Sequence, residues 1–201
     1  MSDLPIRDAA TVILWRNNSG ERQILMGQRG AGAVFMPSKY VFPGGAVDPQ
    51  DAQNPARGHF STDCHHALTL HCKADAPQPD TLAATAQREL AEETGLGLPP
   101  LHPLRFVFRA ITPPGRPRRF DARFFLAQAA GATGDSETFA QASDELSHLH
   151  WIGLDAARAL DLPFITEVVL AEVTAILSGQ DQPGVPFFDN RTDIPTFRRL
   201  I

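Results

Sequence analysis

The sequence predicts an α+β fold, an α/β/α sandwich in which helices pack on a mixed β-sheet. Short runs that are apolar or alternate in polarity are separated by Gly, Pro and Asn turns, which is typical of strands. Between and after these runs lie stretches with the periodicity of helices. No internal repeat or linker divides the 201 residues, so we expect a single domain over residues 1–201.

The N-terminal part is expected to begin with a β-hairpin. Residues 8–16 and 22–28 have the apolar character of strands, and the turn Asn17-Asn18-Ser19-Gly20 between them is a hairpin signal. Residues 30–38 are rich in Gly, Ala and Pro, and we expect them to form a loop. A short strand from Tyr40 to Phe42 follows this loop.

An inserted loop is expected at about residues 49–80, after the sequence Pro43-Gly44-Gly45. This stretch is rich in proline and lacks a sustained periodicity, although residues 62–73 could form one short helix. Its cysteines and histidines are of the types that bind zinc, but they lack the paired spacing of a zinc site. We therefore expect these residues to lie on a packing helix: Cys64, His65, His66, His71 and Cys72.

The clearest helix covers residues 81–94, where Asp80 or Thr81 can cap the start and Gly95 can end the helix. Residues 104–111 and 119–128 are expected to form two strands joined by a Pro-Pro-Gly turn. The remaining predicted elements are a strand at 147–152, helices at 154–160 and 165–177, and a surface strap containing Pro183, Pro186 and Pro195.

The composition excludes several classes of protein. A net charge of −5 does not favour nucleic acid or an anionic membrane as a partner. No apolar run approaches the roughly 20 residues of a membrane helix, and the N-terminus lacks the features of a signal peptide. Two cysteines in a chain of this size suit a reducing compartment, so we expect a cytoplasmic protein. A homodimer is a candidate assembly, although no residue indicates one.

Three glutamates share one side of the predicted helix at 81–94. Glu89, Glu92 and Glu93 stand at positions i, i+3 and i+4, beside an apolar stripe that contains Leu90. Like charges this close repel one another, and partial burial increases the cost. A hard divalent cation such as Mg²⁺ or Mn²⁺ would remove that penalty. A solvated acidic helix face is the alternative interpretation.

The residues around these glutamates resemble a known motif. The segment from Arg88 to Leu96 is similar to the second half of the Nudix box, REUxEExGU with U apolar, and matches all seven specified positions. The first half of the box begins at Gly45, but Gly45 lies 43 residues before Arg88, where an uninterrupted box needs 14. About 29 residues are therefore inserted. The first glutamate of the box falls on Asp51 counted from Gly45, or on Asp80 counted from Arg88.

A second segment resembles one branch of this superfamily, the coenzyme A diphosphatases. Residues 112–125 are similar to its TP-x-x-R-x-x-RFDT-x-FF segment, with Ala122 in place of Thr. Arg29 lies 13 residues before Phe42, which suits the branch's signature, but Ala33-Val34 replaces its Leu-Arg pair. The resemblance covers residues from about 8 to 178 and implies a Nudix fold with the box helix and the C-terminal helices on the sheet.

The resemblance implies a metal-dependent diphosphatase that acts on a small nucleotide-type substrate. Mg²⁺ or Mn²⁺ would be held by Glu89, Glu92 and Glu93, with help from the backbone carbonyl of Gly44. Arg88 can pair with Glu92 and orient it. The proton acceptor is either a box glutamate or an acidic residue on a later loop, for which Glu145 is the candidate and Asp144 the second choice.

Arginines are the expected contacts for the phosphates, because a planar guanidinium can hold a phosphate with two hydrogen bonds. The candidates are Arg29, which follows a predicted strand, and Arg116, Arg118 and Arg119 in the turn after Pro113, with Arg123 nearby. A solubilising loop tip is the alternative for this group.

Three functions remain open. Coenzyme A or acyl-CoA is the first substrate expected from the resemblance, and ADP-ribose or a dinucleotide is the second. A non-catalytic Nudix module that senses a nucleotide is the third. The intact Arg88, Glu89, Glu92 and Glu93 argue against the third, because binding alone would not need a cluster of repelling carboxylates.

Overall fold

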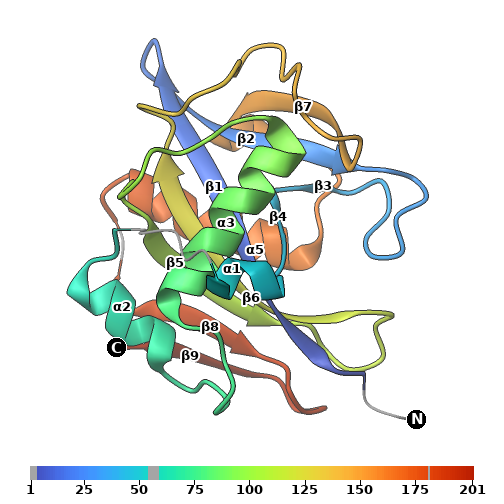
Figure 1. Cartoon of the computed structure of the whole chain (residues 1–201), viewed down its shortest axis with the longest axis vertical. Helices are drawn as coiled ribbons and strands as arrows, with labels where there is room; N and C mark the ends of the chain where they lie inside the picture. The colour runs from blue at the N-terminus through green and yellow to red at the C-terminus, as the bar shows by residue number, and fades with distance from the viewer. Residues whose placement is uncertain (1–3, 54–58, 181) are drawn as a thin grey trace.

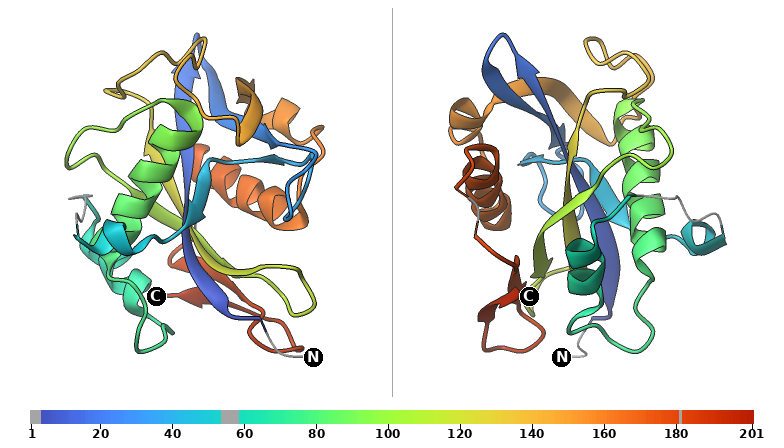
Figure 2. Two further views of the ribbon diagram at one scale, coloured as in Figure 1. Left: turned by 45° about the vertical axis from the view of Figure 1, so that its right-hand side comes forward. Right: turned by 90° about the vertical axis from the view of Figure 1, so that its left-hand side faces the viewer.

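The computed structural model describes residues 4–53, 59–180 and 182–201. Its nine strands form one mixed sheet, with α3 on one face and α5 on the other (Figures 1 and 2). This arrangement confirms the predicted α+β sandwich. The strands are β1 Ile6–Asn18, β2 Glu21–Arg29, β3 Tyr40–Val41, β4 Gly44–Ala46, β5 Arg105–Ile111, β6 Arg119–Gln128, β7 Leu146–Gly153, β8 Val185–Asp189 and β9 Thr196–Leu200. The helices are α1 Pro49–Gln53, α2 Thr62–Thr69, α3 Pro79–Thr94, α4 Leu154–Ala157 and α5 Phe164–Leu177.

The centre of the sheet is the parallel pair of β1 and β6. The strand order is β3-β2-β1-β6-β5-β8-β9, while β4 pairs with β1 and β7 pairs with β2. The predicted hairpin of β1 and β2 is confirmed, and its two-residue turn places Ser19 at φ 53° and Gly20 at φ 94°. Two positive φ angles match the twist of the flanking strands, which explains the Asn-Ser-Gly sequence.

Both faces of the central strands are buried, and successive residues of β1 pack in different layers. Val12 and Leu14 pack in the core layer that includes α3, whereas Ile13 between them packs in the layer that includes α5. All three side chains are 0% exposed. This explains why the strand reads as a continuous apolar run rather than an alternating one.

The predicted inserted loop contains more structure than the sequence indicated. Its short helix is confirmed as α2, but α1 was not expected, so the interpretation of this stretch as a loop with one helix is wrong at its start. Helix α1 is only five residues long, and the Asp51 carboxylate accepts a hydrogen bond from the Asp48 N–H at 2.9 Å. A local contact of this kind leaves no periodicity in the sequence.

Helix α3 begins two residues earlier than predicted. Gln78 occupies the N-cap position without a side-chain hydrogen bond, so the prediction that Asp80 or Thr81 caps the helix is wrong. Pro79 explains this start, because its fixed φ suits the first helical position and it has no N–H to satisfy. The predicted end is confirmed: Gly95 adopts φ 74° and donates its N–H to the Ala91 carbonyl at 2.9 Å.

The C-terminal tail is a β-hairpin and not the predicted surface strap. Strand β8 runs parallel to β5 and antiparallel to β9, and its Phe187 is completely buried. Pro183 and Pro195 lie outside the two strands, and pairing with β5 starts at Phe187, after Pro186. The prolines therefore limit the hairpin without preventing it. Helix α4 is also shorter than the predicted 154–160. Among the described residues, no helix is long and apolar enough to cross a membrane.

Candidate active site

The glycine turn and the acidic helix lie against each other. Strand β4 pairs with Ala9 to Thr11 of β1, and α3 packs on both strands. A Cβ atom on Gly45 would lie 2.4 Å from the carboxylate carbon of Glu89, so this position requires glycine. The Gly44 N–H donates to Glu93 Oε2 at 2.7 Å. Two residues 49 positions apart in the chain are thus joined by a direct hydrogen bond.

Two of the three glutamates are buried beside this turn. Glu93 is 2% exposed, and burial raises its pKa to about 8, with the nearby Glu89 adding to the shift. Burial also raises the pKa of Glu89, against the lowering effect of Arg88. The side chain of Glu92 is 57% exposed. Burial therefore raises the free energy of the ionised form of both Glu89 and Glu93.

Arg88 ties the acidic residues together. Its Nε and Nη2 donate to the two carboxylate oxygens of Asp51 at 2.8 and 3.0 Å. Its Nη1 donates to Glu89 at 2.8 Å and to Glu92 at 3.1 Å, and Nη2 also reaches the Ala46 carbonyl. These contacts raise the pKa of the guanidinium further above its ordinary value, the hydrogen bond to Asp51 contributing most.

Asp51, and not Asp80, is the partner of Arg88. Asp80 is exposed, whereas Asp51 is 4% exposed and also accepts a hydrogen bond from the Thr85 hydroxyl at 2.8 Å. Burial alone would raise the pKa of Asp51, but its hydrogen bonds, that to Arg88 first, hold the pKa below its ordinary value. Of the two residues that the box spacing offers, the one counted forward from Gly45 is therefore the one that contacts Arg88. Thr85 was not predicted, although it stands one helical turn before Glu89 on the same face.

Glu145 reaches this cluster from the loop before β7. The Ser143 N–H donates to the Glu92 backbone carbonyl at 3.0 Å, which fastens that loop to the end of α3. The charge of Glu145 makes a small contribution to the raised pKa of both Glu89 and Glu93. Its side chain is exposed and free to meet a ligand.

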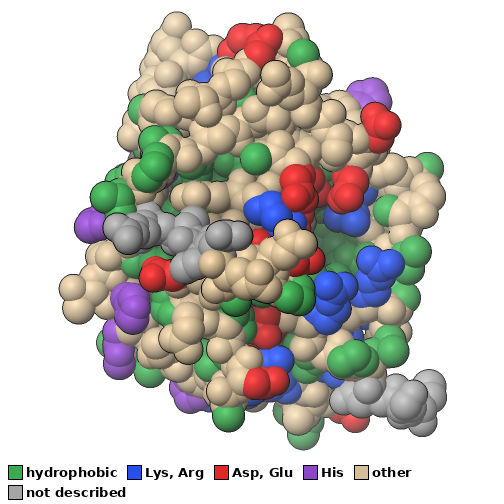
Figure 3. Space-filling model, viewed as in Figure 1, with side chains coloured by type: hydrophobic (Ala, Val, Ile, Leu, Met, Phe, Trp, Pro, Cys, Tyr) green, Lys and Arg blue, Asp and Glu red, His purple; other side chains and the backbone are tan. Residues whose placement is uncertain are grey.

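Arg29 supplies positive charge on the same side. It ends β2, and its charge lowers the pKa of Glu93. Its Nε is buried and has no hydrogen-bond partner among the described residues. Figure 3 shows acidic and basic side chains gathered beside the C-terminal half of α3, to the right of the centre.

The comparisons with known proteins show the family of the chain. The model of the NUDIX domain matches residues 71–173, just over half of the chain. The chain belongs to the NUDIX domain family. The matched residues include all of α3 with Arg88, Glu89, Glu92 and Glu93, and they exclude Gly44 and Gly45.

Solved structures agree with the Nudix assignment. A NUDIX hydrolase from Alicyclobacillus acidocaldarius has a TM-score of 0.61 and 26% identity, over 84% of this chain and 90% of that chain. The NUDIX domain of Shewanella oneidensis NrtR, solved with ADP ribose, has a TM-score of 0.57 and 14% identity, over 86% and 89%. A C. elegans Ap4A hydrolase has a TM-score of 0.54 and 16% identity, over 87% and 99%. The last two show the fold alone. No curated protein sequence matches. Together with the family match, the first structure supports an enzyme, a Nudix hydrolase.

The predicted group of arginines is divided by the structure. Arg116 and Arg118 are exposed on the loop between β5 and β6. Arg119 is 2% exposed and donates to the carbonyls of Thr112 and Asn190 at 3.0 and 2.8 Å. It is therefore a structural residue, and its assignment as a substrate contact is corrected. Arg123 is equally buried, and it forms ion pairs with two aspartates, Asp8 and Asp121.

The donor set of the Nudix site suits a divalent metal ion, since carboxylate oxygens are its preferred ligands. Nudix hydrolases in general use such ions. As placed, no three His, Cys, Asp or Glu side chains converge on one point in the described part of the chain. Glu92 instead turns toward Arg88, while Glu89 and Glu93 face the glycine turn.

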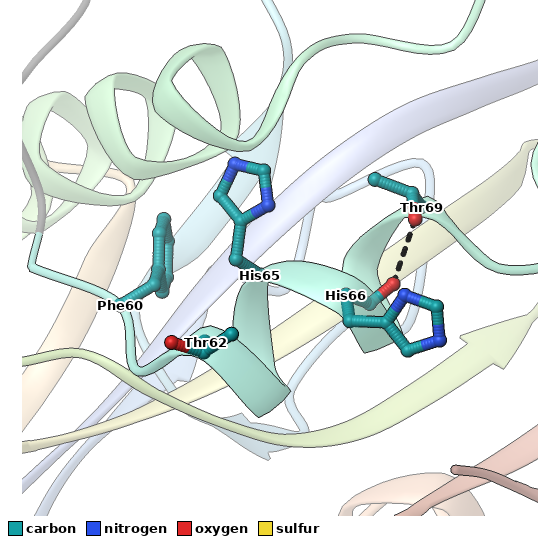
Figure 4. A pocket seen from close by; sticks show the side chains of 5 residues that line it. All are labelled: Phe60, Thr62, His65, His66 and Thr69. Carbon is teal, nitrogen blue, oxygen red and sulfur yellow. Dashed lines mark hydrogen bonds between the residues drawn. The ribbon is translucent and has the colours of Figure 1, made fainter.

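The histidines near α2 lie apart from one another in the described structure. His65 and His66 line a pocket on α2 with Phe60, Thr62 and Thr69, and their rings point in different directions (Figure 4). No group of three metal-binding side chains occurs among residues 59–180, which include both cysteines. Cys64, His65 and His66 lie on α2, which packs through the buried Ala67 and Leu68 as expected, but His71 and Cys72 lie beyond its end at Thr69, so the expected helix is wrong for these two.

Proposed function

We propose that this chain catalyses the metal-dependent hydrolysis of a diphosphate bond in a nucleoside diphosphate linked to another group. The observation that carries the proposal is the pair of buried carboxylates, Glu89 and Glu93, held against the Gly44-Gly45 turn. Burying two acidic groups costs folding free energy. A bound cation would offset this unfavourable free energy, because it would pair with the two buried carboxylates.

Mg²⁺ or Mn²⁺ is the cation proposed. Glu89, Glu92 and Glu93 would hold it, with the backbone carbonyl of Gly44. When bound, such an ion neutralises the diphosphate and lowers the pKa of a bound water. Arg88 acts through its neighbours: its hydrogen bonds to Glu89 and Glu92 orient these carboxylates, and Asp51 fixes the guanidinium.

Glu145 is the proposed general base. Its exposed carboxylate stands on a loop fastened to α3 through Ser143, and its charge acts on the pKa of Glu89. It would accept the proton of the attacking water as the phosphorus–oxygen bond forms, and the other phosphate would leave with the electron pair of the broken bond. Arg29, whose Nε lacks a protein partner among the described residues, would donate to a phosphate oxygen.

Coenzyme A or acyl-CoA is the first substrate we propose, because residues 112–125 resemble the segment of the coenzyme A diphosphatases. ADP-ribose or a dinucleotide is the alternative. It is supported by the likeness to a NUDIX domain solved with ADP ribose and to an Ap4A hydrolase. A sensing module without catalysis is disfavoured, since Arg88 and all three glutamates are present.

The test is a substrate panel with Mg²⁺ and Mn²⁺, containing CoA, acyl-CoA, ADP-ribose, NADH and nucleoside triphosphates. We expect hydrolysis of CoA or its esters to dominate, and strong preference for ADP-ribose would replace that substrate. Glu92→Gln should lower turnover by about 100-fold or more, because it removes a proposed ligand whose side chain contributes little to the core. Normal turnover in this variant, with the fold intact, would exclude the metal assignment.

A further inference from the structure

Helix α5 presents an apolar stripe on the side that faces away from the sheet. Its outward residues recur at the spacing of one helix face, and all four are apolar and at least partly exposed: Phe164, Val168, Ala171 and Ala175. The helix carries only two charged residues, Glu167 and Glu172. A helix that is apolar on nearly all sides is typical of one that is buried on nearly all sides. Figure 2 shows α5 on the outer side of the sheet, opposite to α3, so this stripe is available to another surface.

Aromatic rings extend the stripe to the edge of the sheet. The ring of Phe164 lies 6.4 Å from that of Phe188 in β8, which lies 6.5 Å from that of Phe197 in β9, the last strand in the sheet order. Phe164 and Phe197 are 68% and 60% exposed, which leaves about 250 Å² of the two rings uncovered. A stable homodimer buries about 800 Å² per partner, of which about 65% is apolar. These two rings would supply about half of that apolar area.

The order of residues in the stripe favours a second copy of the same helix as its occupant. The intervals between the four positions are the same when the helix is read in either direction. If two copies of α5 packed antiparallel, Phe164 would face Ala175 of the partner subunit, and Val168 would face Ala171 of the partner subunit. Each contact pairs a larger side chain with an alanine, as interdigitated helix packing requires. The same surface serves on both copies, which is the property of a two-fold interface.

The charges beside the stripe do not oppose this packing. Glu172 is already paired with Arg199, at 2.8 Å. Glu167 stands on the opposite flank of the stripe, about 140° around the helix from Glu172. In a two-fold antiparallel pair, each flank meets the same flank of the partner, so Glu167 would lie beside Thr174 of the partner subunit and not beside Glu172. The interface therefore brings no glutamate of one flank against a glutamate of the other.

We propose that α5 and the adjoining Phe188 and Phe197 form the interface of a homodimer, in which the two α5 helices pack antiparallel about a two-fold axis. None of these residues belongs to the acidic site, so the dimer would form whether or not the chain hydrolyses a diphosphate. Because α3 lies on the opposite face of the sheet, the two acidic sites would open on the outer sides of the dimer.

Sedimentation equilibrium of the full chain tests the dimer. At about 10 μM, the unaltered chain should have twice its mass of 21.9 kDa. Ala171→Lys and Ala171→Glu should each raise the dissociation constant at least about 100-fold, because the two-fold axis places the like charges about 4.5 Å apart along the helices. The control Ala74→Glu changes an exposed alanine between α2 and α3 and should keep the constant. A monomeric unaltered chain, or the same constant in all variants, would overturn the dimer.

A mixture of the two Ala171 variants tests the antiparallel arrangement. Lysine and glutamate both favour the helical conformation, so each variant should keep its helix content, which circular dichroism measures. The equimolar mixture should regain the dimer, because opposite charges then face each other, and a mixture that stays monomeric would overturn the arrangement. A monomeric chain that binds neutral phosphatidylcholine vesicles, and loses this binding in Phe164→Ser, would assign the surface to a lipid bilayer and also overturn the dimer.

Discussion

Glu93 is the residue of the site whose negative charge is most strongly disfavoured by burial. Its carboxylate is 2% exposed, and its pKa of about 8 means that a proton is retained at neutral pH unless a cation takes its place. The Gly44 N–H opposes this shift without cancelling it. Metal binding and proton release are therefore expected to be linked at this residue.

The pH dependence of stability tests this interpretation. Because the folded protein keeps a proton on Glu93 that the unfolded chain loses above its ordinary pKa of 4.5, the free energy of unfolding should fall as pH rises from 4.5 to about 8. The slope contributed by one such group approaches about 1.4 kcal/mol per pH unit. Urea unfolding in the presence of a chelator should show this decline, and Glu93→Gln should reduce it. The exposed Glu167→Gln should leave the decline unchanged, and a flat profile for the unaltered protein would refute the prediction.

Asp51 is expected to matter through Arg88. Asp51→Asn removes the charge from a two-point hydrogen-bonded pair and should cost about 1.5–3 kcal/mol of stability. It should also lower kcat more than it raises KM, because Glu89 and Glu92 lose their fixed neighbour. Asp80→Asn changes the other residue that the box spacing offered, on the exposed side of α3, and should change stability by less than about 0.5 kcal/mol. Thermal unfolding and steady-state kinetics measure both effects, and equal behaviour of the two variants would contradict the assignment.

At the scale of elements, local sequence determines some helix ends and turns, but it does not determine every strand. The end of α3 follows from Gly95, whose left-handed conformation favours glycine, and the β1–β2 turn follows from Ser19-Gly20. Strand β4 could not be predicted from Gly44, Gly45 and Ala46, which have low β propensity. It is a strand because β1 pairs with it and because Glu89 leaves no room for a side chain at Gly45.

The C-terminal hairpin of β8 and β9 also depends on a contact between residues far apart in the chain, made by Arg119. This guanidinium donates to the carbonyls of Thr112, Asn190 and Arg191, and so joins the β5–β6 loop to the turn after β8. Arg119→Met should cost about 2–3 kcal/mol by leaving buried carbonyls without a donor, and should speed hydrogen exchange in β8 and β9. Arg118→Met, one residue away and exposed, should change stability by less than about 0.5 kcal/mol. Similar losses in both variants would show that Arg119 is not an anchor.

At the scale of the molecule, the sequence predicts the α+β sandwich, but it does not predict strand β4 or the hairpin of β8 and β9 at the end of the sheet. The central strands are apolar and regular, so periodicity identifies them, and the motif of α3 predicts the acidic residues of the site. The assembly of that site depends on contacts between distant residues. Gly44 meets Glu93, Asp51 meets Arg88, and the loop of Glu145 is fastened to Glu92. Partners of this kind are set by the sheet order and cannot be read from local propensity.

We propose that the carboxylates of α3 hold a divalent cation against the glycine turn. Titration calorimetry of the metal-free chain with Mn²⁺ near pH 8.5, above the pKa of about 8 of Glu93, tests this. We expect saturable binding, weakened at least about tenfold in Glu89→Gln and in Glu93→Gln, since each removes one anionic ligand. Absence of saturable binding in the unaltered chain, or equal affinity in all three proteins, would contradict the claim.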